Sequence, residues 1–133
     1  MSALMLVAML WTTVDITAVK AEPDPIRRAT KAIDYAFSAL QDARRQMDDA
    51  ALFQTSIEAV AQGAELAADS LEEGPRKIGD WKKAEMRVRD LLRRLATLRQ
   101  DAPIDDRAAV EAVEARVRVA NEKLLALVMG RRK

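Results

Sequence analysis

Residues 81–98 read WKKAEMRVRDLLRRLATL, a stretch in which apolar side chains return at helical spacing. Two apolar rows have a seven-residue period and lie three positions apart: Trp81, Val88 and Leu95, then Ala84, Leu91 and Leu98. This pattern predicts an amphipathic helix that buries one face along its whole length. Burial of a large apolar side chain is worth roughly 1.5–3 kcal/mol, so the helix requires neighbours along that face.

Three further segments of the chain carry the same period. Their leading rows are Ile26, Ile33, Leu40 and Met47, then Ile57, Ala64 and Leu71, and last Val110, Val117 and Leu124. Four such helices joined by short loops predict an all-α fold, an antiparallel up-down-up-down four-helix bundle. Residues 22–133 would form this single helical bundle domain, with residues 1–21 as a separate segment.

Turn and capping residues predict the helix ends. Asp24-Pro25 suits the start of the first helix, and Glu73-Gly74-Pro75 the end of the second. Asp80 and Asp105 are the expected N-caps of the third and fourth helices. Gly130 is the expected stop of the fourth helix.

The apolar period changes phase after Met47, which leaves two folds open. A break near Asp48 gives four helices of matched length. Without a break, residues 26–73 form one long helix of about 72 Å, followed by a C-terminal helical hairpin. Half of that long helix would be uncovered unless the protein dimerised, so the break is preferred.

The N-terminal segment differs in composition from the rest. Ala3 to Trp11 are nine consecutive apolar residues, whereas a membrane-spanning helix needs about twenty. Val19-Lys20-Ala21 then places small residues where a signal peptidase reads, which predicts a cleaved signal peptide and a periplasmic or secreted protein. The acidic Asp15 and the lack of a basic residue before the apolar run argue against cleavage. An uncleaved hydrophobic helix or a misplaced start codon therefore stays open, and the protein would then be cytoplasmic.

The chain has no Cys and no His, which removes most catalytic and metal-binding side chains. No thiolate nucleophile, zinc-thiolate site or His-based acid–base pair can be built. We therefore expect a non-enzymatic protein without cofactor, metal or small-molecule substrate.

The outward face of the third helix is basic. Residues 74–100 hold nine basic and three acidic side chains. The candidate anion-binding face is Lys82, Lys83, Arg89 and Arg93. Such a face could bind an acidic membrane surface or an acidic protein, while the lack of aromatic residues on it disfavours nucleic acid. The alternative is a solvated face whose charges pair locally, as Glu85 with Arg89 and Asp90 with Arg94.

Two other helical faces have a distinctive composition. The second helix carries an outward acidic row, expected to be ordinary surface: Glu58, Gln62, Glu65, Asp69 and Glu72. This row makes the first half of the chain acidic against the basic third helix, a polarity that could dock the halves or steer an association.

The fourth helix carries a second set of apolar residues outside its seam: Ala112, Ala115, Val119, Leu125, Ala126 and Met129. This set is either wedged into the bundle or against the N-terminal segment, or it forms a protein-interaction face for an unknown partner or for self-association. The resulting functional hypothesis is a small exported helical protein that acts non-catalytically through protein–protein interaction. The alternative is a peripheral binder of anionic surfaces.

Overall fold

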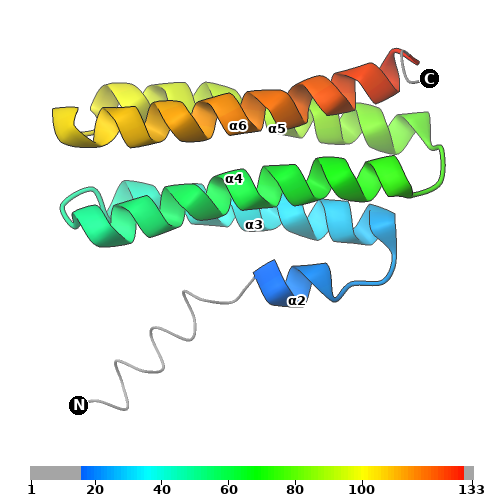
Figure 1. Cartoon of the computed structure of the whole chain (residues 1–133), viewed down its shortest axis with the longest axis horizontal. Coiled ribbons are helices and arrows are strands. Elements are labelled where there is room, and N and C mark those ends of the chain that lie inside the picture. Colours follow the sequence, from blue (N-terminus) through cyan, green and yellow to red (C-terminus); the bar gives the residue numbers. More distant parts are fainter. Residues whose placement is uncertain (1–15, 131–133) are drawn as a thin grey trace.

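A computed structural model of the chain describes residues 16–130, and all of its secondary structure there is helical. The elements are α2 (Ile16–Lys20), α3 (Pro25–Arg45), α4 (Ala50–Glu73), α5 (Ile78–Asp101) and α6 (Ile104–Val128). The four long helices form a four-helix bundle, which confirms the predicted fold class (Figure 1). Most of the predicted signal segment, residues 1–15, lies outside the described residues, and its last part forms α2.

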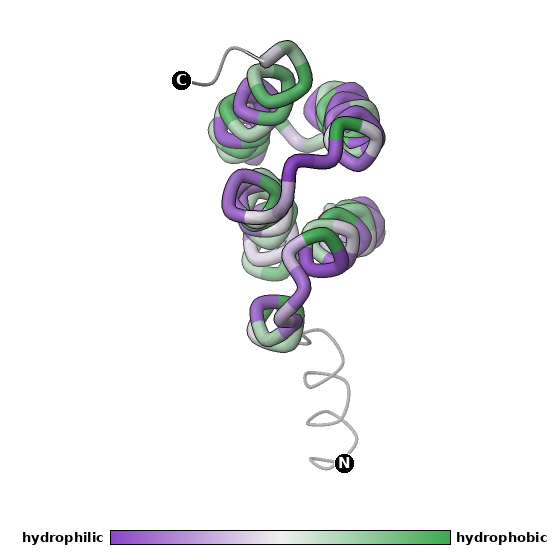
Figure 2. Tube along the Cα trace, turned by 90° about the vertical axis from the view of Figure 1, so that its right-hand side faces the viewer, coloured by the Kyte–Doolittle hydropathy of each residue, from purple (hydrophilic) through white to green (hydrophobic). Residues whose placement is uncertain are grey.

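Consecutive long helices run in opposite directions, but the order of neighbours around the bundle differs from the order along the chain. The α3–α4 hairpin lies against the α5–α6 hairpin, so that α4 packs beside α6 and α3 beside α5. The linker of residues 74–77 crosses diagonally from α4 to α5 (Figure 2). As a result, α4 and α6 are parallel neighbours.

The apolar rows that the sequence predicted are buried in this arrangement, except that Ile26 and Met47, at the two ends of their row, are half-buried. Phe53, Val88, Leu95 and Val117 are completely inaccessible to solvent. Both rows of α5, from Trp81 to Leu98, belong to the same core. Burial of these seams against one another supplies the main favourable term for folding.

The predicted break between the first two helices is confirmed. α3 ends at Arg45, and α4 begins after Asp49, whose side-chain Oδ1 accepts a hydrogen bond from the Leu52 N–H at 3.2 Å. The single long helix is therefore excluded. At the start of α3, Asp24 accepts from the Arg27 N–H at 3.1 Å and Pro25 takes the first helical position, as predicted.

The predicted N-caps of α5 and α6 are wrong. Lys77 and Pro103 hold these positions, and neither provides a side-chain capping bond. Asp80 and Asp105 instead lie inside the first turn. A carboxylate in the first turn still interacts favourably with the positive end of the helix dipole. From the sequence alone, such a residue is therefore hard to distinguish from an N-cap. Beyond α6, Gly130 has φ +67° and ends the helix as predicted.

Candidate protein-interaction surfaces

The second apolar set of α6 faces solvent. Val119 and Met129 are each 55% exposed and Leu125 is 40% exposed, while Ala112 and Ala115 are also exposed. Ala126 is half-buried. The seam of α6 points the other way, into the core. The set is thus an outer face of the helix and is not wedged into the bundle that the described residues form.

Leu125 is the outermost member of this set, about 40° around the helix from Met129 on the side away from Val119. At about 100° per residue, it lies roughly 120° around the helix from Val119. The structure therefore groups Ala112, Ala115, Val119, Ala126 and Met129 into one stripe, named the α6 stripe below. Leu125 belongs to the flank of α6.

The acidic row of α4 faces α6 and is paired there. Arg116 donates to Glu58 at 2.7 Å and to Glu65 at 2.7 and 3.0 Å, and Lys123 donates to Asp69 at 3.2 Å. The hydrogen bonds that Arg116 donates, those to Glu65 first and those to Glu58 second, raise its pKa. The row is thus a packing feature of the parallel α4–α6 contact, and it does not meet the basic helix α5. Glu58 and Glu65 lie seven residues apart on α4, and Arg116 and Lys123 lie seven residues apart on α6. This shared spacing is the sequence feature that could have predicted the ion pairs between the two helices.

Two of the buried carboxylates of the α5–α6 hairpin, Glu85 and Glu114, are paired with an arginine. Glu85 accepts from Arg89 and, at 3.2 Å, from the Asn121 side chain. Its pKa is lowered, chiefly by the hydrogen bond from Arg89. Glu114 is also buried and forms an ion pair with Arg99 at 3.4 Å. These groups stabilise the hairpin and do not converge on a common pocket.

Ion pairs occupy half of the candidate anion-binding face. Arg89 is bonded to Glu85, and Asp90 accepts from both Arg93 and Arg94. Both predicted local pairs, Glu85 with Arg89 and Asp90 with Arg94, are therefore present. Within residues 16–130, Lys82 and Lys83 are exposed and have no ion-pair partner. The unpaired cationic surface of α5 is consequently smaller than the sequence suggested.

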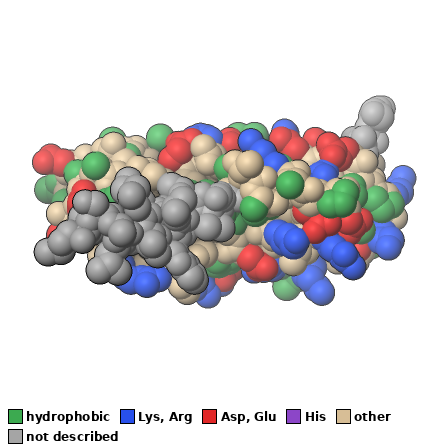
Figure 3. Space-filling model, turned by 90° about the horizontal axis from the view of Figure 1, so that it is seen from below, with side chains coloured by type: hydrophobic (Ala, Val, Ile, Leu, Met, Phe, Trp, Pro, Cys, Tyr) green, Lys and Arg blue, Asp and Glu red, His purple; other side chains and the backbone are tan. Residues whose placement is uncertain are grey.

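Two arginines of α5 also contribute to packing against α3. The guanidinium groups of Arg87 and Arg94 each lie 5.3 Å from the centre of the Phe37 ring. Arg87 further binds Asp34 at 2.7 Å. On the face seen in Figure 3, basic and acidic side chains are interspersed over the part that the structure describes. Neither the packing of these arginines nor the mixture of charges on this face favours a large surface of positive charge alone.

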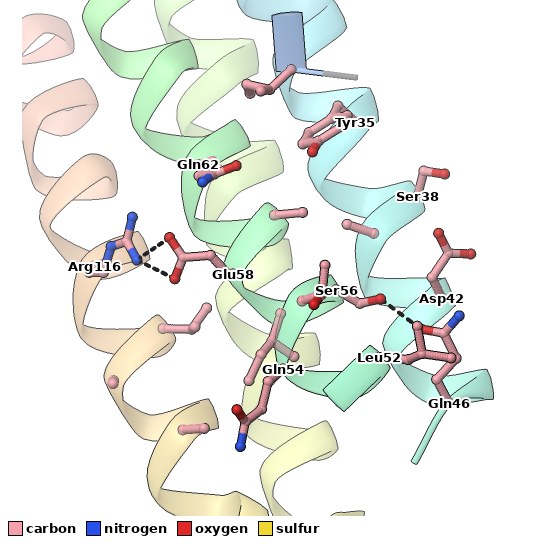
Figure 4. Close-up of a pocket in the computed structure, with 18 of the residues that line it drawn as sticks. Tyr35, Ser38, Asp42, Gln46, Leu52, Gln54, Ser56, Glu58, Gln62 and Arg116 are labelled. Atoms are coloured by element: carbon pink, nitrogen blue, oxygen red, sulfur yellow. Dashed lines mark hydrogen bonds and ion pairs between the residues drawn. The ribbon is translucent and has the colours of Figure 1, made fainter. Parts of the chain in front are cut away.

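A groove of about 810 Å³ lies between α2, α3, α4 and α6 (Figure 4). Its apolar lining includes Leu52, Ile57 and Val113, and its polar lining is mostly hydroxyl and amide side chains. The Ser56 hydroxyl donates to Gln46 at 2.8 Å, and Glu58 and Arg116 are bonded to each other. No period of the sequence revealed this groove, because four separate helices contribute to it.

No cluster of three or more acidic side chains in residues 16–130 is placed to hold a metal ion. None of the helices in that range is long and apolar enough to cross a membrane.

The fold and its surfaces define an all-α four-helix bundle with an exposed apolar stripe on its last helix and a groove beside α2. Comparison of the chain with models of known protein families, with characterised proteins and with solved structures gives no match.

Proposed function

We propose that this protein acts non-catalytically, by binding another protein through the α6 stripe. The observation that carries the proposal is the exposure of Val119 and Met129, each 55%, on a helix whose opposite side is already buried. Apolar side chains aligned on one exposed helix face are typical of helix-mediated protein contacts. The alanines of the stripe allow a partner helix to approach closely.

Export after cleavage behind Ala21 is part of this proposal. None of the residues of α2 is fully buried and only Val19 packs against the core, so removal of residues 16–21 takes no fully buried side chain from it. Glu22 would become the first residue, and in the full chain it is hydrogen-bonded to α3. Its carboxylate binds Lys31 at 2.7 Å, and its carbonyl accepts from Arg28 at 3.0 Å. The N-terminal residue of the protein recovered from its host tests this part: a chain that begins before Glu22 would contradict it.

The α6 stripe is tested by charge substitution. Val119→Glu and Met129→Glu should abolish self-association measured by light scattering after size-exclusion chromatography. Met86→Glu is the matched control, because Met86 is 62% exposed on α5, away from the stripe. For a different partner, a photo-crosslinking residue at position 119 should capture it in the host, and the same residue at position 86 should not. A monomeric wild type that also gives no position-119 adduct would overturn the proposal.

A second candidate function, binding to an anionic surface, is supported by the unpaired Lys82 and Lys83. Both lie near the start of α5, where the helix dipole adds positive potential. Binding to vesicles that contain acidic lipid should weaken steeply with ionic strength and with Lys82→Gln/Lys83→Gln. Binding that is insensitive to salt would contradict this candidate.

A further inference from the structure

The groove beside α2 contains apolar surface that the described residues leave uncovered. Leu52, at the start of α4, lines it and is 47% exposed. Ala59 and Val113 extend the apolar lining towards α6. An exposed apolar lining within a groove is typical of a site that receives another segment of chain.

The first residues that the structure describes lie at the edge of this groove. Ile16 and Thr17, the first residues of α2, both line it. α2 runs antiparallel to α3, so Ile16 lies on the side of the C-terminal half of α3 (Figure 1). Ser38, Asp42 and Gln46 of that half line the groove as well. The part of the chain before Ile16 is therefore the segment with the shortest path to the groove.

The length of that segment is sufficient. Ser38 and Gln46 are about 12 Å apart along α3 at 1.5 Å per residue. Residues 3–15 would cover about 19 Å as a helix, and more if extended. No stretching of the chain is needed to fill the groove from one end to the other.

The chemistry of the segment and that of the groove also match. Residues 3–14 carry no charged side chain, and nine of them, Ala3 to Trp11, are consecutive and apolar. In the groove, Glu58 is paired with Arg116 and Asp42 with Arg45, and the other polar groups are neutral hydroxyls and amides. An uncharged segment can bind there without breaking these ion pairs.

We propose that the groove between α2, α3, α4 and α6 is the docking site of residues 3–14 of the same chain. The uncleaved protein thereby keeps its apolar segment out of water. Removal of that segment opens the groove, and with it Ala109 and one member of the α6 stripe, Ala112. This inference goes beyond the proposed partner of the α6 stripe, since Val119 and Met129 do not line the groove.

The fluorescence of Trp11 in the full chain tests the docking. The protein has two tryptophans, Trp11 and the buried Trp81. The spectrum of the wild type minus that of Trp11→Phe isolates the emission of Trp11 and leaves the core unchanged. Docking predicts a blue-shifted Trp11 emission that acrylamide quenches weakly. Leu52→Glu should shift this emission to the red and increase the quenching constant several-fold.

Controls separate docking from other causes. Met86→Glu, on a helix outside the groove, should leave the Trp11 emission unchanged. If Leu52→Glu loses its helical circular dichroism, Ser38→Arg on the rim of the groove replaces it. A Trp11 emission typical of free tryptophan in the wild type, or one unaffected by both groove variants, would overturn the proposal. So would a red shift on dilution, because the segment would then occupy a second copy of the chain.

Discussion

Gly63 lies on the side of α4 that faces α3, and its missing side chain is required there. A Cβ at this position would stand 2.7 Å from the Ala32 carbonyl oxygen and 2.9 Å from the Ala36 Cβ. Glycine in a helix ordinarily costs about 1 kcal/mol relative to alanine. The close contact between the two helices offsets this cost.

Gly63→Ala should therefore lower the free energy of unfolding, by about 1–3 kcal/mol, because α3 and α4 must move apart. Urea denaturation followed by circular dichroism measures the change. Gly79→Ala is the matched control, since a Cβ at position 79 meets nothing within 4 Å. That variant should be as stable as the wild type or more so. Equal stability of Gly63→Ala and the wild type would disprove the close contact.

Glu85 is a buried charge whose contribution to stability depends on pH. The hydrogen bond from Arg89, followed by that from Asn121, lowers the pKa of Glu85 below its ordinary value of 4.5. A lowered pKa in the folded state means that the stabilisation is complete above about pH 4.5 and is lost as the pH falls through the folded-state pKa.

Glu85→Gln should accordingly cost about 1–3 kcal/mol at neutral pH, because charge-assisted hydrogen bonds are replaced by weaker ones. The difference from the wild type should shrink in strongly acidic solution, where the wild-type carboxylate is protonated. Urea titrations at both pH values test this, with the exposed Glu111→Gln as control. A difference that does not change with pH would contradict the assignment.

At the scale of the helices, the α4–α6 contact combines an apolar core with a row of ion pairs. Arg116 joins Glu58 and Glu65, one heptad apart on α4, and is itself 38% exposed. Partly exposed pairs of this kind contribute only modestly to stability, because solvent screens them. Their main effect is on the register of the two parallel helices.

A double-mutant cycle should reveal this coupling. Arg116→Ala and Glu65→Ala are expected to show an interaction energy of about 0.5–1 kcal/mol in dilute buffer, and less at high salt. The cycle of Arg116→Ala with Glu111→Ala is the control, since Glu111 is exposed and forms no pair with Arg116. Additive effects of Arg116 and Glu65 at low salt would show that the pair does not couple α4 to α6.

At the scale of the whole molecule, the bundle is complete from α3 to α6. α2 contacts α3 and α4 but contributes no buried residue to the core. Val19 packs against the core only partly buried. The stability of the bundle should therefore depend little on residues 16–21.

A chain that begins at Glu22 should unfold cooperatively, with a free energy within about 1 kcal/mol of a chain that begins at Ile16, since both lack the docked residues 3–14. Chemical denaturation of the two chains side by side provides the comparison. The variant Leu95→Ala, at a completely buried position, should in contrast cost about 2–5 kcal/mol and shows that the assay detects core damage. If the chain that begins at Glu22 alone failed to fold, residues 16–21 would belong to the domain.

Much of this fold could be predicted from the amino-acid sequence alone. The seven-residue rows identify which face of each helix is buried, because that period is a property of the helix itself. The break at Asp49, the cap at Asp24 and the pairs Glu85–Arg89 and Asp90–Arg94 are likewise local, so short-range spacing sufficed. The candidate interaction face on α6 was also found in this way, although one of its members, Leu125, lies on the flank.

Which faces meet which was decided only in three dimensions. A heptad row shows that a helix needs neighbours but does not say which ones, so the diagonal crossing of residues 74–77 and the α4–α6 contact could not be foreseen. The pairing of Arg116 with Glu58 and Glu65 and the groove beside α2 follow from that choice. Both join residues that are distant in the chain, and their energies depend on all four helices at once.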